Sequence, residues 1–399
     1  MANDKHIKGF WDLPSIHRAY YYHYCSSSDS LAAAGGGITI VRFRAERDDL
    51  ADVLARAGRA VGARSPLPIL QGILCEVENG VLRVTGTDTE LTIRTTHEVE
   101  ALQEGRTLIP AKLAAEAVRK LPAGAVTVSA TGGEVEITGN GPRFRLRELA
   151  VEDYPTVAVP SPGAGAAVDG ETLVKALSQV GVAASTDEAR PTLTGVLFET
   201  EGEGLRLVAT DSYRLAVRDL PGVEGTATTL VPFRALREIA RTVGDVKMTI
   251  DLGDREATFA SERGTLTVRV IEASFPNYRM LLREAYPNRL VVSRTGLLEA
   301  VGRAALVAED HIPVRLSMHD GGVELSVSRQ EVGEETEHLA GEYTGEEMTI
   351  AFNTRYLTDG VSAVDSDEVV IDTVDPLKAG VVRAEGDSAF RYLLMPVRL

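Results

Sequence analysis

The sequence predicts an α+β fold in which one domain pattern, two short helices packed on antiparallel sheets, occurs three times. The first observation behind this prediction is an internal repeat. The segment 67–94 recurs as 191–218, and Gly72 and Gly195 hold the same place in the two copies, 123 positions apart. The second observation is that helical and strand patterns alternate within each copy. Repeats of this kind indicate one supersecondary unit used several times.

The repeat continues along the chain. Residues 107–121 match residues 229–243, and a weaker third copy places Phe352 121 positions beyond Val231. The length of 399 residues fits three domains of ordinary size. We therefore expect a tail at 1–40 followed by domains at 41–158, 167–284 and 288–399.

The elements of the first domain follow from apolar spacing. A helix is predicted over 48–61, because its apolar residues recur at helical spacing and its acidic start and basic end suit the helix dipole. A second helix begins at Pro110, where the missing N–H costs nothing, and continues to 121. Alternating apolar and polar residues predict strands over 81–86, 125–130 and 134–139. Segments rich in Pro, Gly and Ala at 157–168 and 283–288 are expected to be linkers.

The composition excludes several classes of protein. A net charge of −16 argues against a protein that wraps or reads DNA through a basic exterior. The contents of 44% hydrophobic and 25% charged residues are those of a globular protein. Cys25 and Cys75 cannot build a disulfide framework, and no apolar run is long enough to cross a membrane. We expect a cytoplasmic protein without a membrane partner.

Residues 1–40 differ from the rest of the chain. They hold the only Trp, a Ser run and a Gly run, without an apolar period, which is typical of an appended tail. They lack the apolar core of a secretory signal. His17, His23 and Cys25 have no fourth ligand at zinc spacing, so a zinc site is not expected. An alternative interpretation is that translation begins at Val41.

No constellation of catalytic groups is found. The sequence has neither a phosphate-binding loop nor a nucleophile elbow, and its histidines are scattered without metal-ligand spacing. We therefore expect a protein that is not an enzyme and that holds no cofactor or metal. The alternative is a β-rich enzyme or ligand-binding module of three repeats, which would need a deep polar pocket with perturbed carboxylates.

Two acidic features have structural interpretations. Asp88 and Asp211 recur with a preceding Thr at equivalent points of two domains, which favours a turn in which Asp accepts hydrogen bonds from its own backbone. The stretch 331–347 contains seven Glu and no Lys or Arg. Such a stretch is typical of a solvated face.

Basic residues gather on the second helix of two domains. The helix 110–121 carries three basic side chains against Glu116, and the helix expected over 232–243 carries three against Glu238. Lys and Arg are also good exposed helix formers, so either helix alone is weak evidence. The same excess at matching repeat positions predicts one basic surface inside an acidic body.

Motifs in the order of one family then identify a resemblance. They are RSPLPIL (64–70), LFETEGEGLRLVATDSYRLAV (197–217), FPNYRMLL (275–282), FNTRYL (352–357) and YLLMPVRL (392–399). From Val41 onward the chain resembles the bacterial DNA polymerase III β subunits, the sliding clamps. The resemblance implies three DNA-clamp domains per chain and a head-to-tail homodimer that closes a six-domain ring around double-stranded DNA. It also implies a non-catalytic processivity factor that tethers the replicative polymerase, the clamp loader and repair proteins through short Leu/Phe-containing motifs.

The resemblance assigns residues to three surfaces. Those expected to face the DNA are Arg64, from the family motif, and the helix residues Lys112, Arg119, Arg234, Arg237 and Arg241. The ring-closing contact is expected to join Phe144 to Leu306 and Val307. The peptide-binding cleft is expected to contain Leu193, Thr210, Ser212, Tyr213, Arg214, Leu215, Pro276, Leu281, Asn353, Tyr356, Leu393, Met395, Pro396, Val397 and Arg398. Its aliphatic residues and Met suit a Leu/Phe anchor, and its polar residues suit a peptide backbone. Ser212 and Met280 depart from the family, which often has Gly and a basic residue there.

Overall fold

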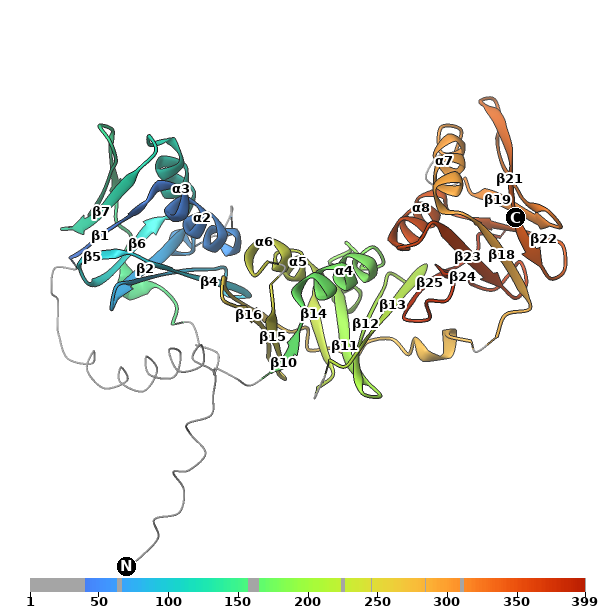
Figure 1. Cartoon of the computed structure of the whole chain (residues 1–399), viewed down its shortest axis with the longest axis horizontal. Helices are drawn as coiled ribbons and strands as arrows, with labels where there is room; N and C mark the ends of the chain where they lie inside the picture. Colours follow the sequence, from blue (N-terminus) through green and yellow to red (C-terminus); the bar gives the residue numbers. More distant parts are fainter. Residues whose placement is uncertain are drawn as a thin grey trace, which may run out of the picture.

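The chain forms a crescent of three domains with helices on its inner side and sheets on its outer side (Figure 1). The computed structural model describes residues 40–62, 67–156, 165–223, 227–244, 246–283, 285–308 and 312–398. Residues 1–39, which include the tail and its His and Cys residues, lie outside this part, and so does Arg64. Among the described residues no helix is long and apolar enough to cross a membrane.

Domain 1 contains both predicted helices and all three predicted strands. The first helix ends earlier than predicted, at Ala57, because a 3-10 turn over Gly58–Ala60 follows it. The elements are β1 (Val41–Glu46), α2 (Arg47–Ala57), β2 (Gly72–Glu78), β3 (Val81–Thr87), β4 (Leu91–Glu98), β5 (Glu100–Gln103), β6 (Gly105–Pro110), α3 (Ala111–Lys120), β7 (Ala125–Thr131), β8 (Glu134–Thr138) and β9 (Arg143–Arg147). β9 is the edge of a sheet in the order β5-β1-β7-β8-β9.

Domain 2 repeats this pattern with two corrections to the prediction. The linker predicted over 157–168 is partly wrong, because Ala166–Val168 forms a strand that pairs with the strand Met248–Leu252. The single helix predicted over 232–243 is also wrong, since the N–H of Glu238 bonds to the carbonyl of Ala235, a tighter turn that splits the helix. The elements are β10 (Ala166–Val168), α4 (Gly170–Gly181), β11 (Gly195–Glu201), β12 (Gly204–Thr210), β13 (Arg214–Pro221), β14 (Thr229–Pro232), α5 (Phe233–Leu236), α6 (Ile239–Thr242), β15 (Met248–Leu252), β16 (Glu256–Ser261) and β17 (Gly264–Arg269).

Domain 3 has the same two helices, each with a side-chain cap. Ser293 accepts the N–H of Gly296, and Asn353 accepts the N–H of Tyr356. The elements are β18 (Asn288–Ser293), α7 (Arg294–Ala304), β19 (Val314–His319), β20 (Gly322–Arg329), β21 (Gly333–Thr344), β22 (Met348–Phe352), α8 (Thr354–Ala363), β23 (Glu368–Thr373), β24 (Gly380–Ala384) and β25 (Phe390–Leu394). Most of the glutamate-rich stretch is therefore the long strand β21, whose side chains alternate between exposed and half-buried.

The sheets continue across both domain boundaries. β17 of domain 2 pairs with β4 of domain 1, which gives an eight-stranded sheet. β13 of domain 2 pairs with β25 of domain 3, which gives a twelve-stranded sheet. One apolar core accordingly extends through domains 2 and 3 and reaches Leu91 and Ile93 in domain 1. The fused sheets bring residues far apart in the sequence to one surface.

Candidate functional site

The pairing of β13 with β25 builds a cleft between domains 2 and 3. It sets Leu215 opposite Leu393, and both belong to an apolar cluster that includes Tyr278. Just beyond β25, the N–H of Met395 donates to the carbonyl of Tyr213 at 2.9 Å. The C-terminal segment of domain 3 thus lies along domain 2, as the sequence predicts.

The cleft has a buried floor and an exposed rim. Leu215 and Leu393 are only 2% and 3% exposed, and Leu193 and Thr210 are also buried. Met395 and Leu281 are 43% and 47% exposed. The rim residues that the sequence assigns are Ser212, Tyr213, Pro276 and Arg398, which are exposed, and Asn353, Tyr356, Pro396 and Val397, which are half-buried. An apolar floor with a polar rim can hold an aliphatic or aromatic anchor and bind the backbone beside it.

A repeated turn positions the polar end of the cleft. Asp211 accepts the backbone N–H groups of Tyr213 and Arg214, and the Thr210 hydroxyl donates to the Arg214 carbonyl. In domain 1, Asp88 accepts the N–H groups of the two corresponding residues, and the preceding Thr makes the same bond. The predicted Asp turns are confirmed.

Domain 2 adapts this turn to hold a buried cation. The Arg214 side chain, 7% exposed, pairs with Asp211 at 3.0 Å and with Asp359 on α8. It also lies over the ring of Tyr356, 4.3 Å from the centroid, and donates to the Tyr392 hydroxyl at 3.4 Å. Burial by itself would lower the pKa of Arg214, but Tyr392, Asp359 and Asp211 raise it, so the guanidinium stays charged. Arg214 therefore ties domain 2 to domain 3 beneath the cleft.

Sequence reasoning missed part of this arrangement. Asp211 was assigned only to a turn, and neither Asp359 nor Tyr392 was assigned to the cleft. Asp359 lies one helical turn after Tyr356 on α8, so its place beside a predicted cleft residue was a usable signal. Tyr392 lies two residues after Phe390 and is fully buried, where it resembles an ordinary core residue.

The basic helices lie on the inner side of the crescent (Figure 1). Helix α3 carries three exposed basic residues, Lys112, Arg119 and Lys120. None of them forms an ion pair with another residue in the described part of the chain. Arg234 and Arg241 are also exposed, yet they pair with Glu90 and Glu238. Arg237, which the sequence also assigns to the DNA-facing surface, is exposed. Its guanidinium carbon lies 5.9 Å from the centroid of the Phe233 ring.

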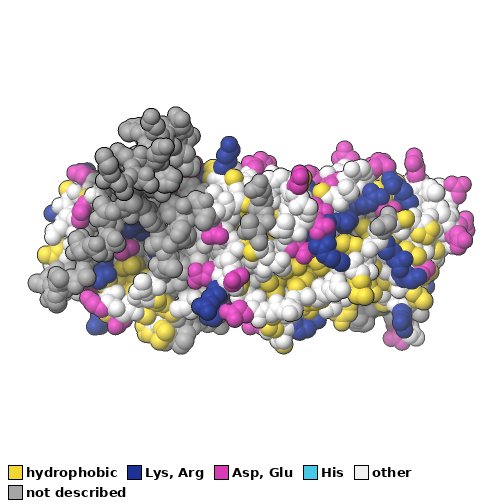
Figure 2. Space-filling model, turned by 90° about the horizontal axis from the view of Figure 1, so that it is seen from below, with side chains coloured by type: hydrophobic (Ala, Val, Ile, Leu, Met, Phe, Trp, Pro, Cys, Tyr) yellow, Lys and Arg dark blue, Asp and Glu magenta, His cyan; other side chains and the backbone are white. Residues whose placement is uncertain are grey.

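Basic side chains are also visible on the outer face over domains 2 and 3 (Figure 2). Some of the basic side chains of these two domains are paired with carboxylates. Arg279 pairs with Glu199 and Glu201, and Arg391 pairs with Asp219. On the inner side, α3 carries three exposed basic residues without a described ion pair, whereas Arg279 and Arg391 on domains 2 and 3 are paired.

The predicted ring-closing residues lie in the two end domains. Phe144 is half-buried on β9, at a sheet edge of domain 1. Leu306 follows α7 in domain 3 and is 85% exposed, while Val307 packs partly against the core. These residues do not meet within one chain.

Family models match all three domains. They are the N-terminal, central and C-terminal domains of the DNA polymerase III beta subunit, which match residues 41–158, 167–277 and 279–398. The chain belongs to the DNA polymerase III β-subunit family. Like the sliding clamps of this family, it is a non-catalytic processivity factor for DNA replication, and the alternative of a three-repeat enzyme or ligand-binding module is set aside.

Relatives support the family over most of the chain. A beta sliding clamp from Streptomyces coelicolor is 35% identical over 90% of this chain and 100% of that protein. A beta sliding clamp homolog, GriR, from Streptomyces muensis is 31% identical over 90% of this chain and 99% of its own length. The DnaN clamp from Bartonella birtlesii, solved bound to griselimycin, is 28% identical with a TM-score of 0.86, covering 90% of this chain and 100% of that one. The Pseudomonas aeruginosa DnaN clamp, also griselimycin-bound, is 26% identical with a TM-score of 0.85, covering 91% and 100%.

Two features bear on metal binding and thiol reactivity in the described part of the chain. No cluster of three His, Cys, Asp or Glu residues suits a metal ion in the part of the chain that the structure describes. Burial, together with Glu76, raises the pKa of the Cys75 thiol to about 12, so this thiol is protonated at neutral pH.

Ser212, where other β subunits often have Gly, has a strained backbone. Its φ is 84°, in the left-handed region that favours Gly, and Thr89 at the equivalent point of domain 1 has a φ of 78°. We expect Ser212→Gly to raise the free energy of unfolding by about 1 kcal/mol, because relief of strain outweighs the added entropy of the unfolded chain. Chemical unfolding measures this change. Ser129→Gly within β7, where φ is ordinary, is the control and should lower stability, and a loss of stability in Ser212→Gly would contradict the strain.

Proposed function

We propose that two copies of this chain close head to tail into a ring around double-stranded DNA in the cytoplasm, with one domain at each of 41–158, 167–284 and 288–399. The observation that carries this proposal is the crescent with its helices on the concave side (Figure 1). Two such crescents joined at their ends enclose a hole lined by helices. A ring holds DNA by topology, so a net charge of −16 is compatible with a DNA-bound protein.

The inner side of α3 supplies the direct contact with DNA. Lys112, Arg119 and Lys120 are exposed there without described carboxylate partners, so they are available to phosphates. The cations of α5 and α6 are less available, because Glu90 and Glu238 pair with Arg234 and Arg241. Domain 1 is therefore proposed as the main DNA-contacting domain of each chain.

Replacing Lys112, Arg119 and Lys120 together by Ala is expected to weaken direct DNA association without changing the dimer. Each lost phosphate contact should reduce the slope of log affinity against log salt by about 0.9. The measurement is a salt titration with short linear duplex. The double variant Arg234→Ala/Arg241→Ala is the matched control and should change the slope less. An equal effect of the two variants would show that the ion pairs do not withhold these arginines from DNA.

The cleft between domains 2 and 3 is proposed to bind Leu/Phe-containing segments of the replicative polymerase, the clamp loader and repair proteins. Leu215, Leu393 and Met395 offer an apolar floor and wall to the anchor side chains. Ser212, Asn353 and Arg398 lie at the rim, where polar atoms can meet the peptide backbone. The two griselimycin-bound relatives support a ligand site on this fold. Micromolar binding, about −8 kcal/mol, is expected for a short Leu-Phe peptide in calorimetry.

The two ends of the crescent carry sheet edges of opposite charge. β9 pairs only with β8 among the described strands, and its exposed side chains are Arg143, Arg145 and Arg147. Arg143 and Arg145 share one carboxylate, that of Glu136, so this edge keeps a positive excess. Residues 333–340 of β21 pair only with β20 and carry several glutamates. Two free edges of opposite charge can add to each other across two chains. Phe144 of one chain is then proposed to cover Leu306 and Val307 of the other.

A further inference from the structure

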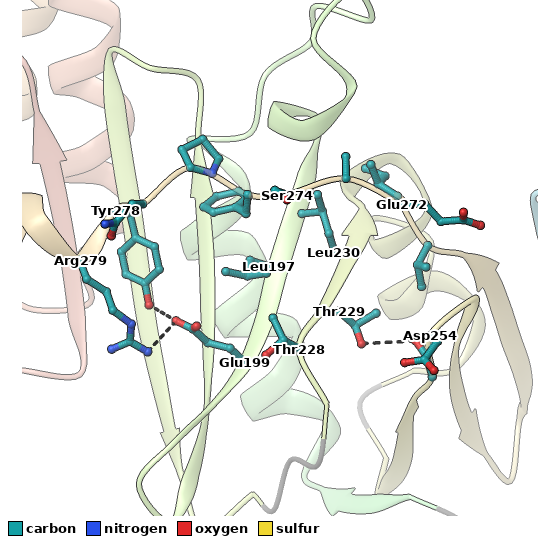
Figure 3. Close-up of a pocket in the computed structure, with 17 residues that line it drawn as sticks. Leu197, Glu199, Thr228, Thr229, Leu230, Asp254, Glu272, Ser274, Tyr278 and Arg279 are labelled. Atoms are coloured by element: carbon teal, nitrogen blue, oxygen red, sulfur yellow. Dashed lines mark hydrogen bonds and ion pairs between the residues drawn. The ribbon is translucent and has the colours of Figure 1, made fainter.

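A cavity of about 400 Å³ lies beside the peptide cleft, on the outer face of domain 2 (Figure 3). The segment 270–279 arches over β11 and β14 and forms its cover. Leu197 and Leu230 lie between the two ends of the cavity in this view. Pro276 is the one cavity-lining residue that the sequence also assigns to the cleft. The cavity is therefore a neighbour of the cleft, and its Leu197, Leu230 and Tyr278 belong to the same apolar cluster as the cleft floor.

The internal repeat shows what fills the equivalent place in domain 1. Leu149 donates its N–H to the Leu108 carbonyl at 2.9 Å, and Ile271 donates to the Leu230 carbonyl at 2.8 Å. These bonds align the two cover segments. After Leu149, Val151 is 7% exposed and packs with Leu108 in a small apolar cluster. An aliphatic side chain thus closes the outer face of domain 1.

Domain 2 lacks this filler. Ala273 stands where domain 1 has Val151, and the segment from Ile271 to the next aromatic, Phe275, is one residue shorter than the segment from Leu149 to Tyr154. Domain 1 forms a 3-10 turn over this segment, whereas 271–275 has no helical turn. The space left by the smaller side chain and the shorter segment is lined by the aliphatic residues Leu197, Leu230 and Ile271, with polar groups around them.

The two ends of the cavity differ in charge. At one end Glu199 is neutralised, because it accepts the Tyr278 hydroxyl and pairs with Arg279 at 3.1 Å. At the other end Asp254 and Glu272 are exposed (Figure 3). Glu272 pairs with Arg269 at 3.8 Å, and because both side chains are more than 60% exposed this ion pair is weak. The cavity thus presents a partly apolar middle and, away from the cleft, an end with two exposed carboxylates, of which Glu272 is in a weak pair with Arg269.

We propose that this cavity is a second contact site for partner proteins, which receives an aliphatic side chain followed by a Lys or Arg side chain. The inference rests on the proposed function of the cleft, because the same partner segment places its Leu/Phe anchor there and crosses Pro276. Val151 in domain 1 shows the size of the aliphatic group, and Asp254 with Glu272 selects the basic one. Linking a weak second contact to the first raises affinity because the second contact becomes intramolecular.

The test compares three kinds of synthetic peptide, five peptides in all, on the dimer by calorimetry. The first is a short peptide that ends in Leu-Phe. The second adds Val-Lys-Lys through a Gly-Ser spacer, at the amino end in one version and at the carboxyl end in another. The third replaces the lysines of each version by Glu. One Val-Lys-Lys version is expected to bind about five- to tenfold more tightly than the short peptide. Equal affinity of the short peptide and both versions would overturn the proposal.

Variants separate the cavity from the cleft. Asp254→Lys/Glu272→Lys should abolish the gain of the Val-Lys-Lys peptide and favour the Glu peptide, while binding of the short peptide is unchanged. Ala273→Leu, which supplies the missing filler, should also abolish the gain. The matched control is Glu152→Lys/Asp153→Lys, at exposed positions of the equivalent domain 1 segment. A gain that survives both cavity variants would overturn the proposal.

The outcome also distinguishes this inference from the proposed cleft. If the short peptide fails to bind, the cleft assignment fails. In that case the cavity is still supported if the Val-Lys-Lys peptide binds the unmodified protein and does not bind the Asp254→Lys/Glu272→Lys variant. No binding of any peptide overturns both.

Discussion

Deleting residues 395–399 is expected to abolish binding of a Leu-Phe peptide while the protein stays a folded dimer. The deletion removes Met395, which forms one wall of the cleft, and the bond from its N–H to the Tyr213 carbonyl. It also removes the bond from the Val397 N–H to the Ala351 carbonyl at 2.8 Å. β25 ends at Leu394, so the strand that joins the two domains remains. Calorimetry should show a loss of more than about 3 kcal/mol, which takes micromolar binding beyond detection.

The control for this deletion is Arg398→Ala, which removes an exposed rim side chain and keeps the wall. It should lower affinity only modestly. Sedimentation and retention on circular DNA should be unchanged in both variants. Peptide binding that survives the deletion would place the partner site elsewhere.

The second large effect is expected at the ends of the crescent. Phe144→Ala or Leu306→Ala should each weaken the dimer by about 2 to 4 kcal/mol, because each removes an apolar anchor at the proposed seam. Phe144 also packs partly against the core of domain 1, so Leu306→Ala is the cleaner test. Leu306 is 85% exposed in the single chain, so its replacement should leave the stability of the protomer almost unchanged. Sedimentation at low concentration measures the change.

Leu377→Ala is the matched control for the ring-closing contact. Leu377 is 69% exposed, and it lies in the turn between β23 and β24 and not at the proposed seam. Its replacement should leave the dimer intact. A dimer that is as stable in Leu306→Ala as in Leu377→Ala would contradict the assignment of the seam.

Local patterns predicted much of the fold because they are short-range. The repeat located equivalent turns at Asp88 and Asp211, and each Asp does bond its own backbone. The split between α5 and α6 was missed, because apolar spacing does not reveal a tightened turn. Partners across domain boundaries were also missed. Arg234 meets Glu90, and Arg214 meets Asp359, pairs set by how the sheets join and not by nearby sequence.

The sheets that cross both domain boundaries have a mechanical consequence. Four residue pairs join β17 to β4 and five join β13 to β25, so moving one domain against another stretches or breaks hydrogen bonds of a ladder. The hydrogen bonds across the domain boundaries therefore hold the three domains in a fixed arrangement. Opening a ring built from two such chains would therefore separate the seam between the chains and leave the domain boundaries intact.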